Sequence, residues 1–422
     1  MNESPREVDL LVVGAAELAT ATGNAAKGGA ALGAVQVLAG HGLALDGGQV
    51  VAVAPDAELR ERFIGRQVID AAGGTLVPGL IDAHTHPVFA TTREDEFELR
   101  TRGASYLEIA EAGGGILNTV RGVRGASEEE LVLHFTLRLD RFLALGTTTV
   151  EAKSGYGLTT ADEKKLLRAI RRAGERHPVE VVPTFLGAHE YPPEFQDDKP
   201  GYVDLLCEEM LPEVVEAGLA EYCDIFTEAT VFGLDESRRI LARAQELGLR
   251  LRLHVDQLTD LGGAELAAEF GADSADHLEN VSARGIEALG AAGVVPVICP
   301  LVSLYIHQGQ EVPGRELIDM GLAPAIATDF NPGSCHTQSM HEVLTWSALR
   351  MRMSVGEALT AATLNAAASL NRAGRLGTLE VGKQADVLVL DLPNHKHLCY
   401  EFGRNPVTHV VKAGKLVLER QA

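Results

Sequence analysis

Apolar and polar positions change pattern twice along the chain, and the middle part is the most regular. Between residues 76 and 376, short apolar runs alternate with segments whose apolar residues recur every three to four positions, as on one face of a helix. These helical segments include 128–145, 161–172, 236–247 and 262–270. The apolar runs predict eight strands, at Leu80–Ala83, Thr147–Ala152, Val179–Phe185, Tyr222–Phe226, Leu251–Val255, Ser274–His277, Val294–Cys299 and Ala323–Thr328. Eight strands alternating with helices favour an α/β fold of the (β/α)₈ barrel type, with a doubly wound open sheet as the alternative.

The two ends of the chain share a different pattern, rich in Val, Ala and Gly with short β-like runs. The pair Asp46-Gly47 between two such runs is typical of a hairpin turn. We therefore predict one small composite β-sandwich domain formed by both termini, residues 1–75 and 377–422, beside a catalytic barrel at 76–376. The Ala- and Gly-rich segment 14–39 is expected to be a loop.

The composition argues against several classes of partner. The 37 basic and 59 acidic residues give a formal charge of −22, which favours neither nucleic acid nor an anionic membrane surface. The five cysteines form no closely spaced pair, as is typical of a reducing compartment. Neither a signal peptide nor a membrane span is apparent, so we expect a cytoplasmic protein. A homodimer stays open, because no apolar helix face stands out as an interface.

Polar side chains follow most of the predicted strands at the point where each strand ends. His84 and His86 follow the first, His254 the fifth, His277 the sixth and Asp329 the eighth. Catalytic groups of such a barrel sit at the carboxyl ends of its strands. Each histidine taken alone is more simply a packed or hydrogen-bonded strand-end residue, but their shared placement favours a common site.

Four of these side chains suit one metal ion. Side chains alternate along a strand, so His84 and His86 point the same way. Together with His254 and Asp329 they supply the ligands of a hydrolytic centre that keeps one position for water. A bound ion lowers the pKa of that water toward neutrality. Imidazole and carboxylate suit zinc and iron equally, and both metals stay open.

The remaining groups have other expected roles. His277 is a candidate to polarise a substrate carbonyl or stabilise an oxyanion, or else it supports a ligand by a hydrogen bond. A carboxylated Lys153 would bridge two metals, but it follows the second strand and no lysine ends the fourth. We therefore expect one ion, with Asp329 as both ligand and proton acceptor.

The motif His84-Thr85-His86 after Val77–Asp82, with His254, His277 and Asp329, resembles the amidohydrolase superfamily over essentially the whole chain. Longer stretches narrow the resemblance to members that open the ring of 4-imidazolone-5-propanoate in histidine breakdown. They are 103–109, 113–117, 153–157, 184–189, 274–279 and 327–334. The resemblance implies hydrolysis of a small anionic heterocycle to N-formimino-L-glutamate.

The resemblance also implies a substrate pocket. Arg93 can grip a carboxylate, Tyr and His can donate to ring or carboxylate oxygens, and the turn at 331–334 offers donors to an anion. Gln257 can only bind, because a neutral amide is no base, whereas some relatives carry Glu there. The implied substrate contacts are Arg93, Tyr106, Tyr156, His189, Gln257, Asn331, Gly333 and Ser334.

Plainer interpretations stand beside some of these assignments. Arg93 lies next to three acids, where a surface ion pair contributes little, and the two tyrosines can be packing residues with satisfied hydroxyls. Leu301–His307 and Cys335-His336 depart from the family pattern, which affects the pocket more than the metal ligands.

The expected reaction is water attack on the ring carbonyl, with Asp329 moving the proton and His277 stabilising the oxyanion. A cyclic amidase or deaminase acting on another heterocycle is the alternative enzyme. A catalytically inactive scaffold of the same fold is the alternative from another class.

Overall fold

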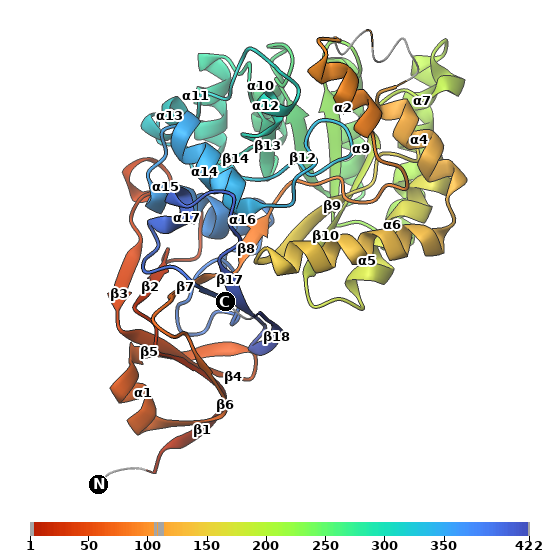
Figure 1. Cartoon of the computed structure of the whole chain (residues 1–422). Coiled ribbons are helices and arrows are strands. Elements are labelled where there is room, and N and C mark those ends of the chain that lie inside the picture. Colours follow the sequence, from red (N-terminus) through yellow and green to blue (C-terminus); the bar gives the residue numbers. More distant parts are fainter. Residues whose placement is uncertain (1–3, 105–107, 109–113, 421–422) are drawn as a thin grey trace.

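The computed structural model describes residues 4–104, 108 and 114–420, and its centre is an eight-stranded parallel sheet. The strands follow one another in the order β15-β14-β13-β12-β11-β10-β9-β8 (Figure 1). Their bounds are Leu80–Asp82 (β8), Thr147–Lys153 (β9), Glu180–Ala188 (β10), Tyr222–Thr227 (β11), Arg250–Val255 (β12), Ser274–His277 (β13), Val295–Ile298 (β14) and Ala325–Ile326 (β15). All eight predicted strands are present, within a few residues of the expected bounds.

The sheet curls into a nearly closed barrel, because its first and last strands meet just beyond their ends. Thr85 bridges to Phe330, and the His86 N–H donates to the Phe330 carbonyl at 2.9 Å. Below this bridge, Asp82 accepts hydrogen bonds from the Thr328 N–H and hydroxyl at 3.0 and 2.6 Å. The barrel is confirmed and the open sheet is excluded.

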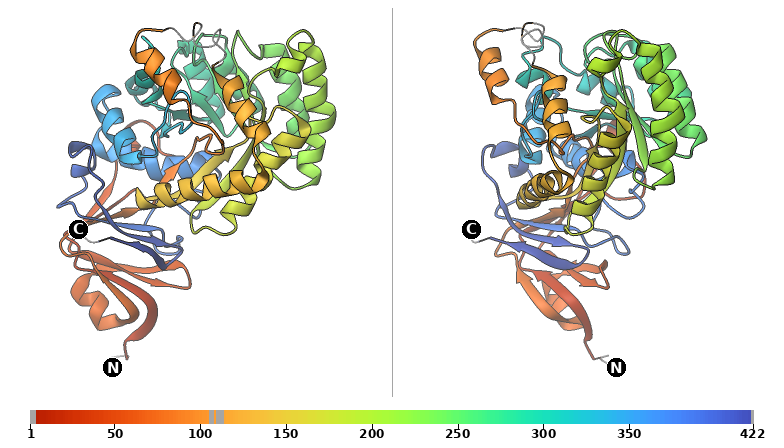
Figure 2. Two further views of the ribbon diagram at one scale, coloured as in Figure 1. Left: turned by 45° about the vertical axis from the view of Figure 1, so that its right-hand side comes forward. Right: turned by 90° about the vertical axis from the view of Figure 1, so that its right-hand side faces the viewer.

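Helices surround the barrel (Figure 2). Two of the predicted ones show how sequence sets their starts: Ser127 and Glu130 form a capping box before α5, and the Thr159 hydroxyl accepts from the Asp162 N–H before α6. The α-helices of this part are α2 (Glu94–Thr101), α4 (Ile116–Gly125), α5 (Glu128–Ala144), α6 (Thr160–Gly174), α7 (Lys199–Leu205), α8 (Leu211–Glu216), α9 (Leu234–Glu246), α10 (Gly263–Phe270), α11 (Ala283–Ala292), α12 (Val302–Tyr305), α13 (Gly314–Asp319), α14 (Met340–Arg350), α15 (Val355–Thr360) and α16 (Ala366–Ser369). Short 3₁₀ or π segments are η2 (Pro193–Phe195), η3 (Leu206–Met210) and η4 (Ala361–Asn365).

Two further sheets lie beside the barrel and contain both ends of the chain. One has the order β5-β4-β1-β6 and the other β18-β17-β16-β7-β2-β3, so strands from the two termini pair within the second sheet. The strands are β1 (Arg6–Val13), β2 (Glu17–Thr20), β3 (Gln36–Ala39), β4 (His41–Asp46), β5 (Gln49–Pro55), β6 (Phe63–Asp70), β7 (Thr75–Pro78), β16 (Val387–Leu390), β17 (Val407–Lys412) and β18 (Lys415–Glu419). Helices α1 (Asp56–Arg62) and α17 (His397–Tyr400) and segment η1 (Gly29–Ala31) complete the elements of the described residues.

The expected loop at 14–39 is wrong at both of its ends. β2 and β3 lie within it and pair antiparallel, because Leu18 and Ala19 of β2 are buried and backbone pairing with β3 and β7 completes the sheet. Within 14–39, residues 14–16 and 21–35 lie outside strands, and η1 falls in the second of these segments. The domain boundaries after residues 75 and 376 stay predictions.

We call the six-stranded sheet β18-β17-β16-β7-β2-β3 the composite sheet, because both ends of the chain contribute strands to it. One residue separates its strand β7 from the barrel strand β8. β7 ends at Pro78 and β8 starts at Leu80, so Gly79 alone connects them. A Cβ at Gly79 would run into the Thr148 side chain, which is why this tight passage needs glycine. The composite sheet therefore holds the strand that leads into His84 and His86.

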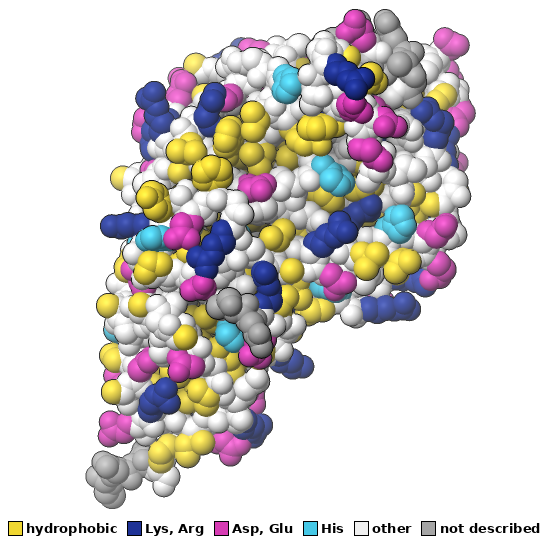
Figure 3. Space-filling model, viewed as in Figure 1, with side chains coloured by type: hydrophobic (Ala, Val, Ile, Leu, Met, Phe, Trp, Pro, Cys, Tyr) yellow, Lys and Arg dark blue, Asp and Glu magenta, His cyan; other side chains and the backbone are white. Residues whose placement is uncertain are grey.

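The surface carries charges of both signs. Acidic and basic side chains are interspersed over the face shown in Figure 3. Among the described residues, no helix combines the length and the apolar character needed to cross a membrane.

Candidate active site

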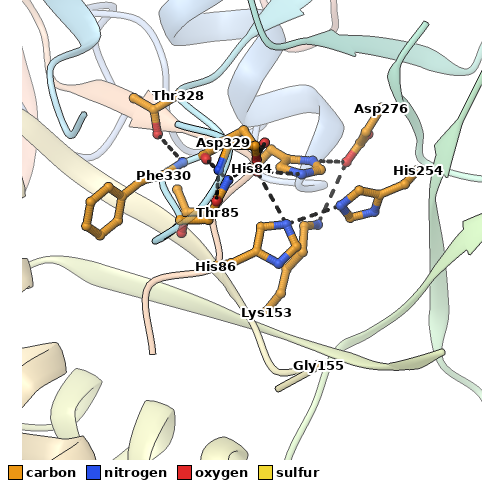
Figure 4. A network of polar contacts seen from close by, with 12 residues as sticks. His84, Thr85, His86, Lys153, Gly155, His254, Asp276, Thr328, Asp329 and Phe330 are labelled. Carbon is orange, nitrogen blue, oxygen red and sulfur yellow. Dashed lines mark hydrogen bonds and ion pairs between the residues drawn. The ribbon is translucent and has the colours of Figure 1, made fainter. Parts of the chain in front are cut away.

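The predicted metal ligands lie together at the carboxyl ends of the barrel strands, where the bridge between β8 and β15 fixes their register. The Asp329 N–H donates to the His84 carbonyl at 3.1 Å, so the two strand ends are locked to each other. Across the barrel, His254 lies at the end of β12 and turns its ring toward His86 (Figure 4). Residues about 245 positions apart in sequence thus share one small, buried volume.

The coordinating atoms converge. His86 Nε2 lies 3.2 Å from His254 Nε2, and Asp329 Oδ1 lies 3.5 and 3.4 Å from Nε2 of His84 and His86. One ligand atom of each of the three histidines lies within 4.8 Å of the others. His84 Nε2 and Asp329 Oδ1 are buried and have no hydrogen-bond partner within the described residues. Such orphaned acceptors facing each other fit a cation between them.

Two buried carboxylates orient the imidazoles from behind. Asp276 Oδ2 lies 2.6 Å from His84 Nδ1, and Asp224 Oδ1 lies 3.0 Å from His254 Nδ1. An N–H donated at Nδ1 leaves Nε2 with its lone pair directed at the centre of the cluster. Both carboxylates are fully buried. His84 and His254 are therefore held in the tautomer whose Nε2 can bind a metal.

Burial also sets the protonation states. It lowers the pKa of His254 to about 4, and, together with nearby positive charges, it holds the pKa of His84 well below 6.5. Burial raises the pKa of Asp329 to about 7, against the opposing effect of His277. The three histidines are neutral near pH 7, and Asp329 can exchange a proton there.

His277 lies beside the cluster but outside the three-histidine group. Its ring centroid is 5.1 Å from that of His84 and 5.2 Å from that of His254. Its Nδ1 lies 3.6 Å from Glu279 Oε1. Burial alone would lower the pKa of His277, but the surrounding carboxylates, Glu279 first, raise it overall. The backbone at His277 and Leu278 has φ of +82° and +74°, a strained turn at the strand end.

A cavity of about 500 Å³ opens onto the cluster. It brings together the predicted residues Arg93, Tyr156, His189, Gln257, Asn331, Gly333 and Ser334 with His86, His254, His277 and Asp329. His189 stacks on His86 with centroids 5.0 Å apart. Tyr106 lies outside the described residues. His84 is fully buried and does not line the cavity. All the other predicted site residues that the structure describes do line it.

Arg93 is buried and enters the cavity, which is not the surface ion pair considered above. Its Nε and Nη2 lie 2.8 and 2.7 Å from Glu96 Oε2, so this side of the guanidinium is already occupied. A Cβ added at Gly333 would collide with Arg93 Nη1. Arg93 can therefore offer a ligand its Nη1 end, and Gly333 makes room for that end.

The turn after Asp329 is organised by Asn331. The Asn331 side chain accepts hydrogen bonds from the N–H groups of Gly333 and Ser334 at 2.8 and 2.7 Å. It donates to the Asp329 carbonyl at 2.7 Å. The expected backbone donors of this turn thus face Asn331 rather than an anion, because the amide side chain satisfies them internally. The Ser334 hydroxyl lies 3.4 Å from Asp329 Oδ2.

Of the two segments that depart from the family pattern, the first lines the cavity and the second packs behind the 331–334 turn. Ile306 and His307, after α12, line the cavity. Cys335 is buried, and its carbonyl accepts from the Asn331 N–H at 2.8 Å. His336 packs on Phe330, with ring centroids 5.1 Å apart. The first departure changes the pocket wall, and the second supports the turn.

Other residues of the site are not marked by the sequence pattern. Arg100 lines the cavity and donates to the Gly333 carbonyl at 3.2 Å, and Phe226 forms part of the wall. Asp224 lies within a strand, two residues before Phe226. A strand-end pattern misses it, although a charged residue inside an apolar run is itself a signal.

The comparisons with known proteins agree with this geometry. The model of the amidohydrolase family matches residues 75–417. An imidazolonepropionase of Symbiobacterium thermophilum is 49% identical over 418 residues, 98% of each chain, and one of Alkaliphilus metalliredigens is 43% identical over 416 residues, 98% of this chain and 99% of the relative. In both cases the similarity extends over nearly the full length of the two proteins compared.

Solved structures share the fold at lower identity. An adenosine deaminase from Xanthomonas campestris with bound zinc has a TM-score of 0.74 and 23% identity, covering 98% of this chain and 94% of that one. A triazine hydrolase variant has a TM-score of 0.77 and 20% identity, covering 97% and 94%. The family implies a divalent metal and a hydrolase. This chain belongs to the amidohydrolase family, and within it to the imidazolonepropionases.

Proposed function

We propose that the protein hydrolyses the ring amide of 4-imidazolone-5-propanoate to N-formimino-L-glutamate in histidine breakdown. The observation that carries the proposal is the convergence of three neutral histidines and Asp329 on a cavity that also contains Arg93. A cluster of metal-ligand type suits amide hydrolysis. The positively charged guanidinium of Arg93 suits a substrate that carries a carboxylate. The names of the relatives point to the same substrate.

His84, His86, His254 and Asp329 are the proposed ligands of one divalent ion. When bound there, an ion would make a water molecule more acidic and would polarise the amide carbonyl. Zinc and iron both suit three imidazoles and a carboxylate. Lys153 supports the single-ion assignment, because its Nζ lies 2.7 and 2.9 Å from the carboxylates of Asp224 and Glu151. An ammonium group paired in this way is no bridging ligand.

Asp329 and His277 are proposed to carry the proton and charge movements. Asp329, with its pKa raised to about 7, accepts a proton from the attacking water and returns it to the ring nitrogen when the C–N bond breaks. The water oxygen joins the carbonyl carbon, giving a carboxylate and a formimino group. His277, whose pKa is raised, donates to the oxygen on which negative charge develops.

The pocket residues are proposed to orient the substrate. Arg93 presents its Nη1 end to the propanoate group, while Tyr156, His189 and Gln257 surround the ring. Tyr106, which lies outside the described residues, is proposed as a further substrate contact from the sequence alone. Asn331, Gly333 and Ser334 shape the opposite wall, mainly by holding Asp329 and leaving room for Arg93. A cytoplasmic location and a homodimer remain proposals, to be checked by cell fractionation and by sedimentation of the purified protein.

A substrate panel tests the proposal against its rivals. We expect turnover of freshly prepared imidazolone propionate to exceed that of guanine, cytosine and dihydro-ring amides by at least a hundredfold in kcat/KM. Preference for an aminoheterocycle or another cyclic amide would replace the proposal with one of those activities. Absence of turnover on every substrate, with no metal bound, would favour an inactive scaffold.

A further inference from the structure

Beneath the histidine cluster lies a group of buried charges that the proposed reaction does not use. Its centre is Lys153, the last residue of β9, which is fully buried. Its Nζ lies 2.7 Å from Asp224 Oδ2, 2.9 Å from Glu151 Oε1 and 3.8 Å from Asp276 Oδ2. Figure 4 shows its side chain reaching up beneath His86 and His254, toward Asp276. Three carboxylates from three strands thus meet one cation.

Each of these carboxylates also contacts a segment that carries a candidate ligand. Asp224 contacts His254 Nδ1, and Asp276 contacts His84 Nδ1. Glu151 Oε2 accepts the N–H of Thr85 at 3.1 Å, and Thr85 stands between His84 and His86. His84 and His254 are therefore each one carboxylate away from Lys153 through their rings, and His86 is connected to it through Thr85, its neighbour in the chain.

The charges explain why a cation is needed here. Three carboxylates packed together in a dry interior repel one another and lose their hydration. Arg252 contacts only Asp276 among them, at 3.2 Å. Lys153 is the one group among the described residues that lies within 4 Å of all three. Without Lys153, the repulsion between the carboxylates would favour their moving apart, and the histidines that they contact would move with them.

We propose that Lys153 is the positioning residue of the metal centre: by pairing with Glu151, Asp224 and Asp276 it fixes the positions of His84, His86 and His254 and the tautomers of His84 and His254. It touches neither the ion nor the substrate. This inference rests on the metal site proposed above. It differs from a simple charge effect, because a cation near a metal ion would by itself weaken metal binding.

The test is Lys153→Met, with cobalt(II) as a spectroscopic probe. The matched control is Lys412→Met, which removes another buried lysine–carboxylate pair, with Asp386 at 2.7 Å, in the composite sheet. We expect Lys153→Met to bind cobalt(II) about 10- to 100-fold more weakly and to change the visible bands that report its coordination geometry. Lys412→Met should lower only the unfolding temperature.

The outcomes separate the two proposals. Failure of the wild-type protein to bind one cobalt ion would overturn the metal site itself. Normal wild-type binding, with an unchanged spectrum and affinity in Lys153→Met, would overturn only the role of Lys153, and so would tighter binding. If Lys153→Met does not fold, Asp224→Asn gives the same readouts, since it keeps an oxygen facing His254 but loses the ion pair. An unchanged spectrum and affinity there would also overturn the inference.

Discussion

At the scale of single residues, burial does most to prepare the site. It leaves three histidines neutral and raises the pKa of Asp329 to about 7, while hydrogen bonds at Nδ1 direct the ring lone pairs of His84 and His254 inward. The same residues in water would be partly protonated or randomly oriented. The chemistry therefore depends on the position of each residue as much as on its type.

Asp329 is the residue whose replacement should affect the reaction most selectively. Asp329→Asn keeps the shape of the side chain but removes the proton acceptor, so we expect kcat to fall by at least about a hundredfold. Activity and bound metal are measured on the same sample. The control is Asp319→Asn, at an exposed carboxylate on α13. Near-normal turnover of Asp329→Asn with metal bound would contradict the assigned role.

His341 on α14 gives a pH-dependent prediction away from the site. It is buried, neither ring nitrogen has a hydrogen-bond partner within the described residues, and burial lowers its pKa to about 4. The unfolded chain takes up a proton near pH 6.5 and the folded chain does not, so stability is lost as pH falls from about 6.5 to 4.

His341→Leu should remove this loss. Relative to the variant, the wild-type protein should lose about 2 kcal/mol of unfolding free energy between pH 8 and pH 5. Urea unfolding of both proteins at the two pH values measures the difference, and other titrating groups cancel in the comparison. An equal change in both proteins would show that His341 is protonated in the folded state.

At the scale of elements, the ends of β8 and β15 and the turn after them form one unit. The bridge from Thr85 to Phe330 places Asp329 beside the histidines, and Asn331 then folds the turn so that Gly333 faces Arg93 at the start of α2. Arg100 ties the other end of α2 to the same turn through the Gly333 carbonyl. The histidine cluster and the Arg93 wall of the cavity are thus coupled through this turn.

Gly333→Ala tests this coupling. Its methyl group would displace the Arg93 guanidinium, and loss of a charge-assisted hydrogen bond to the substrate should raise KM about tenfold or more, with a smaller change in kcat. Steady-state kinetics measure both constants. Gly374→Ala is the control, because a Cβ there meets no atom within 4 Å. An unchanged KM would mean that Arg93 does not hold the substrate.

The sequence was sufficient to predict the elements whose signals are local. Apolar runs and helical periodicity found the eight strands, and the polar residues after them found the ligand candidates. Glu96, Asp224 and Arg100 were not assigned, because their roles come from partners that only the folded chain brings near. The internal hydrogen bonds of the 331–334 turn could not be predicted for a similar reason. The sequence shows which groups can donate a hydrogen bond, but it does not show where those groups point in the folded chain.

At the scale of the whole molecule, the composite sheet and the barrel share their packing. Leu388 on β16 is fully buried in the same hydrophobic cluster as Phe142 of α5 and Leu80 of β8. β7 pairs with β16 and passes into β8 through Gly79. The β domain therefore supports the strand that carries the first two histidines, which explains why both termini return to it.

Leu388→Ala should accordingly destabilise the barrel. Removing this side chain from a full core costs about 2–5 kcal/mol. The single tryptophan, Trp346 on α14, reports unfolding of the barrel by fluorescence, while circular dichroism reports both parts. We expect both signals to shift together to lower denaturant. A shift in circular dichroism alone would show that the two parts unfold independently.

The central claim is that one divalent ion, held by His84, His86, His254 and Asp329, serves ring opening of imidazolone propionate. The most direct measurement strips the purified protein with a chelator and titrates zinc or iron(II) back while ring opening is followed. We expect stripping to abolish activity, and we expect activity to return in proportion to added metal and to level off at one equivalent. Full activity of the stripped protein, or a requirement for two equivalents, would contradict it.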